Sequence, residues 1–245
     1  VVRPVRTLLD QRRFLTFPWH IYSDDPLWVP PLIRERRKTM DPQRSVFLQR
    51  GEATFFIAEE RRPWPLRSRV VGTICAAVDW EQIRSVGRRE CVFGFFESVN
   101  DLTVARALIS AVETFAREHR LDSLIGPFNL DYEDGYGILI EGRDRPPAVL
   151  CGHTPVYYRH LIESLGFVPA RAANLAFALE IADPPPELEK IRRSADLARR
   201  RGHYRVRGAR FDRLDEEIAR IHRLLNETLS ADQTEAMPWP QEAVE

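Results

Sequence analysis

Glycine, cysteine and methionine are scarce in this 245-residue sequence, with 12, 3 and 2 copies. Twelve glycines leave little room for the glycine-rich loops that hold phosphates in nucleotide-binding proteins. The cysteines, Cys75, Cys91 and Cys151, are odd in number and far apart. This pattern excludes a scaffold built on disulfides and favours a reducing compartment, so we expect a cytoplasmic protein.

Net charge and long apolar runs are absent as well. The 36 basic residues balance 36 acidic ones, which argues against a dedicated nucleic-acid-binding protein or a protein of anionic membranes. No apolar stretch reaches the roughly 18–20 residues of a membrane-spanning helix, and no signal-peptide pattern opens the sequence. What is present, 44% apolar residues, supports a sizeable core.

Eight arginines fall between positions 192 and 210 and depart from this even balance. Such a run suits contact with RNA or an acidic partner, although it more often forms the solvated face of a helix. Glu189 and Asp196 lie nearby and favour the solvated face. We therefore expect neither a nucleic-acid partner nor a membrane partner.

Hydrophobic periodicity predicts an α/β fold. Apolar runs and alternation predict strands at 1–5, 53–59, 70–78, 91–99, 123–125 and 175–181. Spacings of three and four residues, with caps and prolines, predict helices at 8–15, 18–22, 34–38, 100–120 and 154–165. Three successive strands joined by short links predict a meander, so the sheet is expected to be mixed, largely antiparallel and flanked by helices.

The prolines at 184–186 indicate a domain boundary. We expect one domain at 1–182, a linker helix rich in proline and arginine at 183–202, and the truncated start of a second, similar domain at 203–245. A strand followed by an amphipathic helix repeats there the way the chain begins. Alternatively, that helix packs back on the first domain or on a partner chain.

The order of these elements resembles that of the GNAT acyltransferases, and residues 157–167 resemble the GNAT helix that ends in Leu-Gly-Phe before a last strand. More specifically, most of residues 1–182 is similar to the N-terminal half of a group of bacterial proteins with two GNAT-like halves. The stretches that carry this resemblance are Phe17-Pro18-Trp19, Tyr22, Asp25-Pro26, Trp28–Pro31, Phe93–Glu97, Gly126-Pro127, Asn129, Glu141-Gly142 and Pro146-Pro147.

The resemblance implies transfer of an acyl group from acetyl-CoA or another acyl-CoA to a small-molecule amine. The positions that align with the family's cofactor-binding residues are Phe95, Val99, Thr103 and Ala105, and in the pyrophosphate loop only Ala105 fits. The pyrophosphate loop departs from the family pattern, because Asn100 replaces a basic residue, Thr103 replaces a glycine and Asp101 adds a negative charge. We therefore expect CoA to bind in the complete second half, while this half shapes the acceptor pocket or serves as a scaffold.

The candidate catalytic residues are Glu97, which matches a position of the family, and Tyr158, which lies near one. Glu97 lies late in its strand, where many GNAT enzymes place a general base, although a solvated or arginine-paired carboxylate fits equally. The usual acid, a tyrosine, is replaced by Ile162, and Tyr158 lies one helical turn earlier on the same face. Alternatively, Tyr157 and Tyr158 simply pack at the helix edge.

The loop at 126–141 is the candidate acceptor site. Its acidic and aromatic residues suit an amine or another cation, although Asp, Asn and Gly also dominate ordinary turns. The candidate substrate-binding residues are Asn129, Asp131, Tyr132 and Glu133.

No metal site is expected. Cys151, His153 and His160 lie close in sequence, but no second pair of ligands completes a zinc pattern, so we interpret them as structural. No Walker loop, G-x-S-x-G or H-E-x-x-H motif occurs.

A second interpretation of the whole chain is a catalytically inactive GNAT-fold module for protein interaction, including formation of a homodimer. An enzyme should leave the split between the strands at 91–99 and 123–125 open, whereas such a module fills it with its own side chains.

Overall fold

A computed structural model of the protein describes residues 1–63, 68–130, 136–148, 151–177, 186–202 and 207–232. The chain divides into two units, Val1–Ala170 and Arg171–Glu245. Among the helices of the described residues, none is long and apolar enough to cross a membrane.

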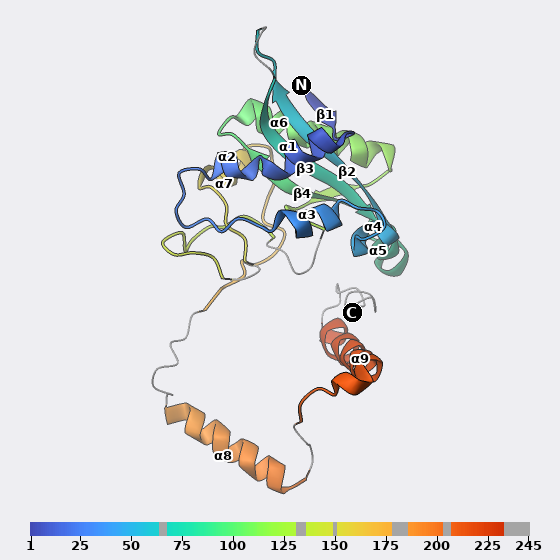
Figure 1. The fold of residues 1–245 in the computed structure, drawn as a ribbon, viewed down its shortest axis with the longest axis vertical. Coiled ribbons are helices and arrows are strands. Elements are labelled where there is room, and N and C mark those ends of the chain that lie inside the picture. The colour runs from blue at the N-terminus through green and yellow to red at the C-terminus, as the bar shows by residue number, and fades with distance from the viewer. Residues whose placement is uncertain (64–67, 131–135, 149–150, 178–185, 203–206, 233–245) are drawn as a thin grey trace. The chain divides into compact units, whose positions relative to one another are not determined.

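One sheet organises the first unit (Figure 1), and its strands are β1 (Val2–Pro4), β2 (Gly51–Glu60), β3 (Arg69–Asp79), β4 (Glu90–Ser98) and β5 (Ser123–Ile125). They lie side by side in the order β1-β2-β3-β4-β5. Neighbouring strands are antiparallel except β4 and β5, which run parallel. The prediction of a mixed, largely antiparallel sheet in an α/β fold is confirmed, and β2, β3 and β4 form the predicted meander.

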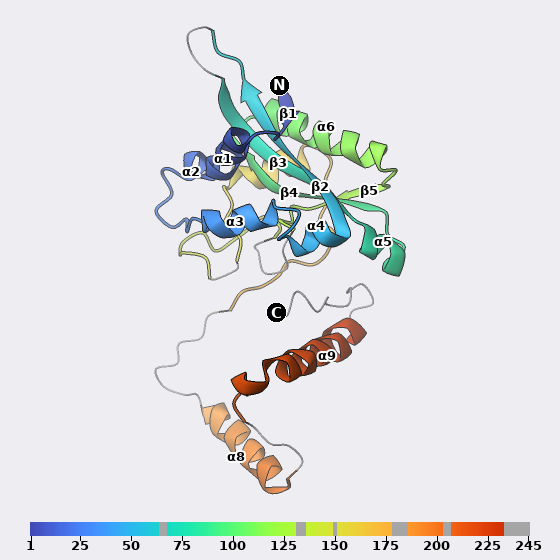
Figure 2. The same cartoon turned by 45° about the vertical axis from the view of Figure 1, so that its right-hand side comes forward.

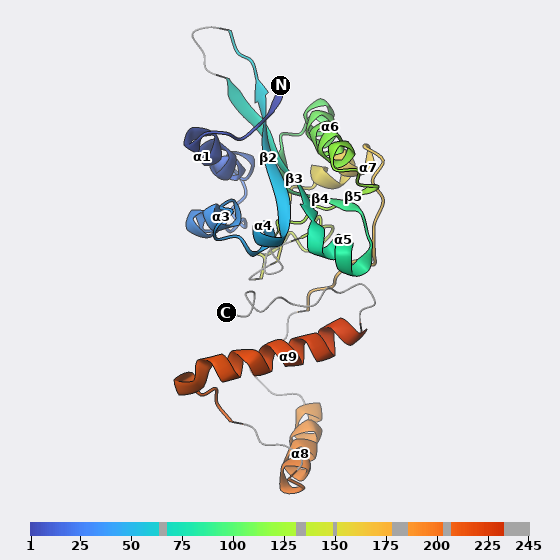
Figure 3. The same ribbon diagram turned by 90° about the vertical axis from the view of Figure 1, so that its right-hand side faces the viewer.

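Helices cover both faces of this sheet. They are α1 (Leu8–Thr16), α2 (Pro18–Ile21), α3 (Ile33–Thr39), α4 (Val46–Arg50), α5 (Trp80–Val86), α6 (Leu102–Glu118) and α7 (Tyr157–Glu163). Figures 2 and 3 show α1, α3 and α4 on one face and α6 and α7 on the other.

The core therefore has two layers, one on each face. Along β3, Ile74 and Ala76 pack with buried residues of α6 and α7, while Cys75 and Ala77 pack with buried residues of α1 and α4. Burial on both faces explains why the sequence of β3 reads as an almost continuous apolar run. Each large apolar side chain buried in this way contributes about 1.5–3 kcal/mol.

Side-chain caps fix the ends of the two longer helices of this unit. Asp101 accepts a hydrogen bond from the backbone N–H of Thr103 at 2.7 Å and caps α6. Thr7 and Asp10 form a capping box at the start of α1. The hydrogen bond from the guanidinium of Arg3, at 2.6 Å, holds the pKa of Asp10 well below its usual range. Arg3 also pairs with Glu59 at 2.6 Å, so β1, α1 and β2 are tied together at one point.

A β-bulge interrupts the pairing of β3 with β4. Thr73 pairs with Glu97 and Cys75 pairs with Gly94, so two residues of β4 lie opposite Ile74 alone. One of the two, Phe95, has a positive φ of 49°, and its carbonyl accepts a hydrogen bond from the hydroxyl of Thr73 at 3.0 Å. The extra residue reverses the alternation of side chains from this point on.

The reversal is visible in the core. Phe93 and Phe96, three positions apart, both pack on the side of α6 and α7, whereas Phe95 packs against the cluster on the opposite face. Without the bulge, Phe95 and Glu97 would share the side of Phe93. The bulge therefore places Glu97 on the side of the sheet that carries α1, α2 and α3.

Several boundaries differ from the predictions. The short helices α4 and α5 were not predicted, although each is capped by a side chain, that of Ser45 and that of Asp79. The helix predicted to open at Thr154 begins at Tyr157. Residues 175–177 are not a strand, and the rest of that predicted strand, 178–181, lies outside the described residues.

The second unit contains α8 (Pro186–Arg200), a 3-10 helix η1 (Phe211–Arg213) and α9 (Leu214–Asp232). Glu217 of α9 lies at 2.8 Å from Arg207 and at 2.6 Å from Arg220. The strand predicted at 203–206 lies outside the described residues. The expectation that a second GNAT-like domain starts here stays a prediction.

None of the three cysteines forms a disulfide. Cys75 and Cys91 are buried and Cys151 is exposed, and all of them are free. Burial raises the pKa of Cys91 to about 11 and that of Cys75 well above its usual range.

Gly94 provides a test of the bulge region, because a Cβ at this position would lie 1.8 Å from the backbone oxygen of Phe128. We expect Gly94→Ala to lower the free energy of unfolding by about 1–3 kcal/mol, the usual effect of overpacking, because backbone must move to admit the methyl group. Gly208→Ala is the matched control, since its Cβ would meet nothing within 4 Å. Urea unfolding of the three proteins measures the difference, and equal stability of Gly94→Ala and the parent protein would contradict this packing.

Candidate functional site

The sheet splits beyond the point where β5 ends. β4 and β5 pair from Glu90↔Ser123 to Val92↔Ile125, and beyond it the backbone N–H of Phe128 donates to the carbonyl of Phe93 at 2.8 Å. The side-chain oxygen of Asn129 then accepts a hydrogen bond from the N–H of Phe95 at 2.7 Å. The first part of the split is therefore filled by the protein's own residues.

Tyrosine hydroxyls from α7 occupy the next part of the same edge. The Tyr158 hydroxyl accepts a hydrogen bond from the N–H of Ser98 at 2.9 Å, and the Tyr157 hydroxyl donates to the carbonyl of Ser98 at 2.8 Å. Ser98 is fully buried, so its backbone groups need partners inside the protein. The two side chains of α7 supply what a neighbouring strand would otherwise supply.

Glu97 lies at the centre of this arrangement. The Tyr158 hydroxyl donates to one of its carboxylate oxygens at 2.6 Å, and the Tyr22 hydroxyl lies 3.5 Å from the other. Glu97 keeps part of its surface accessible, yet the protein atoms around it desolvate the carboxylate strongly. This desolvation raises the pKa of Glu97 to about 7, against the opposing effects of the two tyrosine hydrogen bonds and of the positive charge of Arg36.

The tyrosines around this carboxyl stay protonated. Burial raises the pKa of Tyr157 to about 12, and burial together with the charge of Glu97 raises the pKa values of Tyr22 and Tyr158 well above their usual range. They therefore act as neutral hydrogen-bond donors. A carboxyl that is part ionised near pH 7, flanked by donors, has the properties of a general base.

A second group of residues approaches Glu97 from the loop after α2. Tyr22 stacks on Trp28 with ring centroids 4.7 Å apart and planes within 7°. Asp25 of the same loop lies 2.7 Å from Nε2 of His153. The Tyr22 hydroxyl is 3.1 Å from the backbone oxygen of His153. Residues far apart in the sequence are therefore joined beside the carboxyl.

Sequence reasoning assigned no role at this site to Tyr22, Asp25, Trp28 or His153. The first three were noted only as matches to the resembling group, and His153 was interpreted as structural. Asp25 and His153 lie 128 positions apart, so no local spacing could have paired them. The proline-rich stretch after Asp25 was the one usable signal, because it indicates a rigid loop.

The expected cofactor positions have partners within the chain. The N–H of Val99 donates to the carbonyl of Val71 at 3.0 Å, and the N–H of Thr103 donates to Asp101. Ala105 is fully buried. The N-terminus of α6 is therefore capped by a carboxylate at the place where the resemblance predicts a pyrophosphate loop. A role of Phe95, Val99, Thr103 and Ala105 in binding a cofactor stays a prediction.

The candidate acceptor residues divide into two groups. Asn129 is described and binds the N–H of Phe95, and Asp131, Tyr132 and Glu133 lie outside the described residues. Glu97 and Tyr158, the two candidate catalytic residues, are brought into direct contact.

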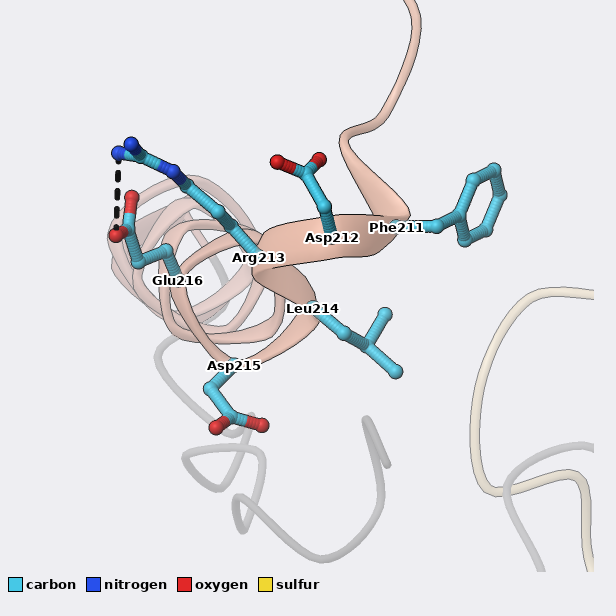
Figure 4. Close-up of a pocket in the computed structure, with 6 residues that line it drawn as sticks. All are labelled: Phe211, Asp212, Arg213, Leu214, Asp215 and Glu216. Carbon is cyan, nitrogen blue, oxygen red and sulfur yellow. Dashed lines mark ion pairs between the residues drawn. The ribbon is translucent and has the colours of Figure 1, made fainter.

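A surface hollow in the second unit has fewer features of a functional site than the surroundings of Glu97. The residues that line it (Figure 4) are Phe211, Asp212, Arg213, Leu214, Asp215 and Glu216. In Figure 4 Asp212 and Asp215 point away from each other, and Arg213 pairs with Glu216 at 3.6 Å. All six residues are exposed, so nothing there desolvates a reacting group.

Curated relatives exist for most of the chain. It is 30% identical over 231 residues to a protein named bacterial ceramide synthase from Caulobacter vibrioides (strain NA1000 / CB15N), a match that covers 94% of this chain and 57% of that protein. It is 31% identical over 166 residues to Protein YghO of Escherichia coli (strain K12), covering 66% of this chain and 41% of that protein. The chain thus spans about half the length of these relatives. No family model and no solved structure matches it.

The raised pKa of Glu97 predicts how the stability of the protein changes with pH. The folded value of about 7 lies above the ordinary value of about 4.3. At pH values between the two, the folded state therefore binds a proton that the unfolded state has lost. The contribution of Glu97 to stability is therefore present at low pH and lost as the pH rises through about 7. Glutamine stays neutral, so we expect Glu97→Gln to gain up to about 3 kcal/mol relative to the parent protein between pH 4 and pH 8.

Urea unfolding at a series of pH values measures this difference. The control is Glu163→Gln, because Glu163 is an exposed carboxylate of α7 that pairs with Arg159 at 2.8 Å. Its difference from the parent protein should change little over the same range. A pH-independent difference between Glu97→Gln and the parent protein would show that the carboxyl titrates normally.

Proposed function

We propose that the protein acts in acyl-CoA-dependent N-acyl transfer, as a GNAT-like protein in which this chain provides the acceptor side of the reaction. The observation that carries the proposal is the Glu97 carboxyl, which has a pKa of about 7 and is held by the Tyr158 hydroxyl at 2.6 Å. A primary amine is protonated at neutral pH and must lose a proton before it can attack a carbonyl carbon. Glu97 is the group in this site that can accept that proton.

The environment of Glu97 also suits the charge of the acceptor. An ammonium group next to the carboxylate neutralises it, which compensates for the desolvation that raises its pKa. The partly exposed ring of Tyr157 adds an electron-rich surface that attracts a cation. An amine is therefore bound and deprotonated by the same group.

The relative from Caulobacter suggests the kind of amine. Its printed name states that it makes ceramide, and a ceramide is the amide of a long-chain amino alcohol with a fatty acid. We therefore take a long-chain amino alcohol as the acceptor and a fatty acyl thioester as the donor. The chain matches 57% of that relative, so we assign to this chain the acceptor side of the reaction and not the whole reaction.

The described residues do not fit acyl-CoA in the manner of the family. A pantetheine chain that adds to β4 needs free backbone groups, yet the N–H groups of Phe95 and Ser98 are bound by Asn129 and Tyr158. A pyrophosphate needs an uncapped helix N-terminus, and Asp101 caps α6 with a negative charge. We therefore propose that acyl-CoA binds at a site outside these residues.

Calorimetric titration tests the acceptor side directly. We expect the chain to bind a soluble short-chain amino alcohol and to bind its N-acetylated form at least tenfold more weakly, because the amide carries no charge for Glu97. Glu97→Gln should lose about tenfold in amine affinity, as expected for a charge-assisted hydrogen bond. Glu163→Gln should bind like the parent protein. Equal binding of amine and amide, or unchanged binding by Glu97→Gln, would contradict the proposal.

Titration with acetyl-CoA and CoA tests the cofactor side. No binding is expected for this chain. If either ligand binds and protects the backbone amides of residues 95–105 from hydrogen exchange, the division between acceptor and cofactor sites is wrong.

One observation favours a second function, that of a catalytically inactive GNAT-fold module for protein interaction or dimerisation. Phe128 and Asn129 fill the split between β4 and β5, as such a module would. Sedimentation of the chain at increasing concentration distinguishes the two functions. A folded dimer that binds neither the amine nor CoA would favour the module.

A further inference from the structure

The contacts beside Glu97 form a closed ring. Tyr22 and Asp25 belong to one loop, in which the N–H of Asp25 donates to the carbonyl of Tyr22 at 3.1 Å. Asp25 reaches across to the ring of His153 at 2.7 Å. The backbone oxygen of His153 in turn receives the Tyr22 hydroxyl at 3.1 Å. Each contact limits the movement of the other two.

Asp25 is suited to hold this ring together. One carboxylate oxygen accepts the N–H of Leu27 at 3.0 Å and shapes the loop, while the other contacts His153. The side chain of Asp25 is 36% exposed and that of His153 is 5% exposed, so the contact is shielded on the histidine side. The hydrogen bond with His153 also lowers the pKa of Asp25, so the carboxylate stays ionised at neutral pH.

The two segments joined by these contacts, that of Tyr22 and that of His153, are each held by further contacts. On one side, Trp28 stacks on Tyr22 and meets Trp19 edge to face at 5.2 Å. On the other side, the Thr154 hydroxyl accepts the N–H of Leu139 at 2.9 Å. The Tyr22 hydroxyl is therefore placed by two separately supported segments.

Tyr22 has one hydroxyl proton and two acceptors within reach. The backbone oxygen of His153 lies at 3.1 Å and the carboxylate of Glu97 at 3.5 Å. A carboxylate is a stronger acceptor than a backbone carbonyl, and a neutral carboxyl is a weaker one. The proton of Tyr22 is thus directed to His153 when Glu97 is protonated and to Glu97 when it is ionised.

We propose that Asp25 and His153 are positioning residues that hold the Tyr22 hydroxyl within reach of Glu97, so that Tyr22 stabilises the ionised carboxylate. The role in catalysis rests on the proposed function, in which ionised Glu97 binds and deprotonates the amine. The positioning itself is a property of the free protein. Arg36 from α3, Tyr157 and Tyr158 from α7, and Tyr22 from the end of α2 act on Glu97 directly, and the negative charge of Asp25 acts on Tyr22 beside it.

The test is the pKa of Glu97, measured by NMR titration of its carboxyl carbon in the whole chain. We expect Tyr22→Phe to raise this pKa by about half a unit to one unit, because one donor to the carboxylate is lost. Asp25→Asn should raise it in the same direction. The double variant should match Tyr22→Phe alone, since both changes act through one hydroxyl.

Asp25→Asn separates positioning from simple electrostatics. Removing a nearby negative charge favours the ionised form of Glu97 and so lowers its pKa, whereas loss of positioning raises it. Asp24→Asn, at the exposed neighbouring position, is the matched control and should leave the pKa unchanged. His153→Ala keeps the backbone oxygen but loses the anchor, and it should behave like Asp25→Asn.

Each outcome decides the proposal. A lowered or unchanged pKa of Glu97 in Asp25→Asn, or effects of Asp25→Asn and Tyr22→Phe that simply add, would overturn it. Amine binding by the same variants tests the other claim separately. If the pKa values shift as expected but the parent protein binds no amine, the positioning stands and the proposed function fails.

Discussion

The site depends on β4 changing its partners halfway along its length. Its first residues are held between β3 and β5, and among the strands that the structure describes its last residues pair with β3 alone. The bulge opposite Ile74 lies just beyond this change and reverses the side-chain alternation. Phe96 can then fill the core beneath α6 and α7, while Glu97 turns toward Tyr22. In a regular strand that kept Phe93 beneath α6 and α7, Phe96 would face the opposite side and Glu97 would share the side of Phe93.

The unpaired edge of β4 determines what surrounds the carboxyl. Buried backbone groups need partners, and the chain supplies them from α7 and from the segment after β5 rather than from another strand. The Tyr158 hydroxyl provides a partner for a backbone group and for a side chain, because it accepts the N–H of Ser98 and donates to Glu97. The group that completes the sheet is therefore also the group that orients the Glu97 carboxyl.

Patterns within a few residues could be predicted from the sequence. The strands of the meander follow from alternation and apolar runs, and α6 follows from its apolar stripe and its Asp101 cap. The helices α4 and α5 were missed because they are short and their apolar pattern is weak, although Asp79 as a cap and Gly87 at a φ of 78° mark both ends of α5. Glu97 and Tyr158 were found through resemblance, since periodicity alone predicts nothing about their contact. The bulge and the pairing of Asp25 with His153 depend on tertiary packing, and no local pattern encodes them.

The distribution of the thiols has a practical consequence for anyone who studies the protein. Cys75 and Cys91 lie in the core with raised pKa values, so neither forms a thiolate that a reagent can reach. Cys151 is exposed and lies two residues before His153. The natural sequence thus offers a single accessible attachment point for a fluorophore or a spin label, on the segment that carries His153, without any engineered cysteine. Movement of that segment can be followed spectroscopically in the unaltered polypeptide.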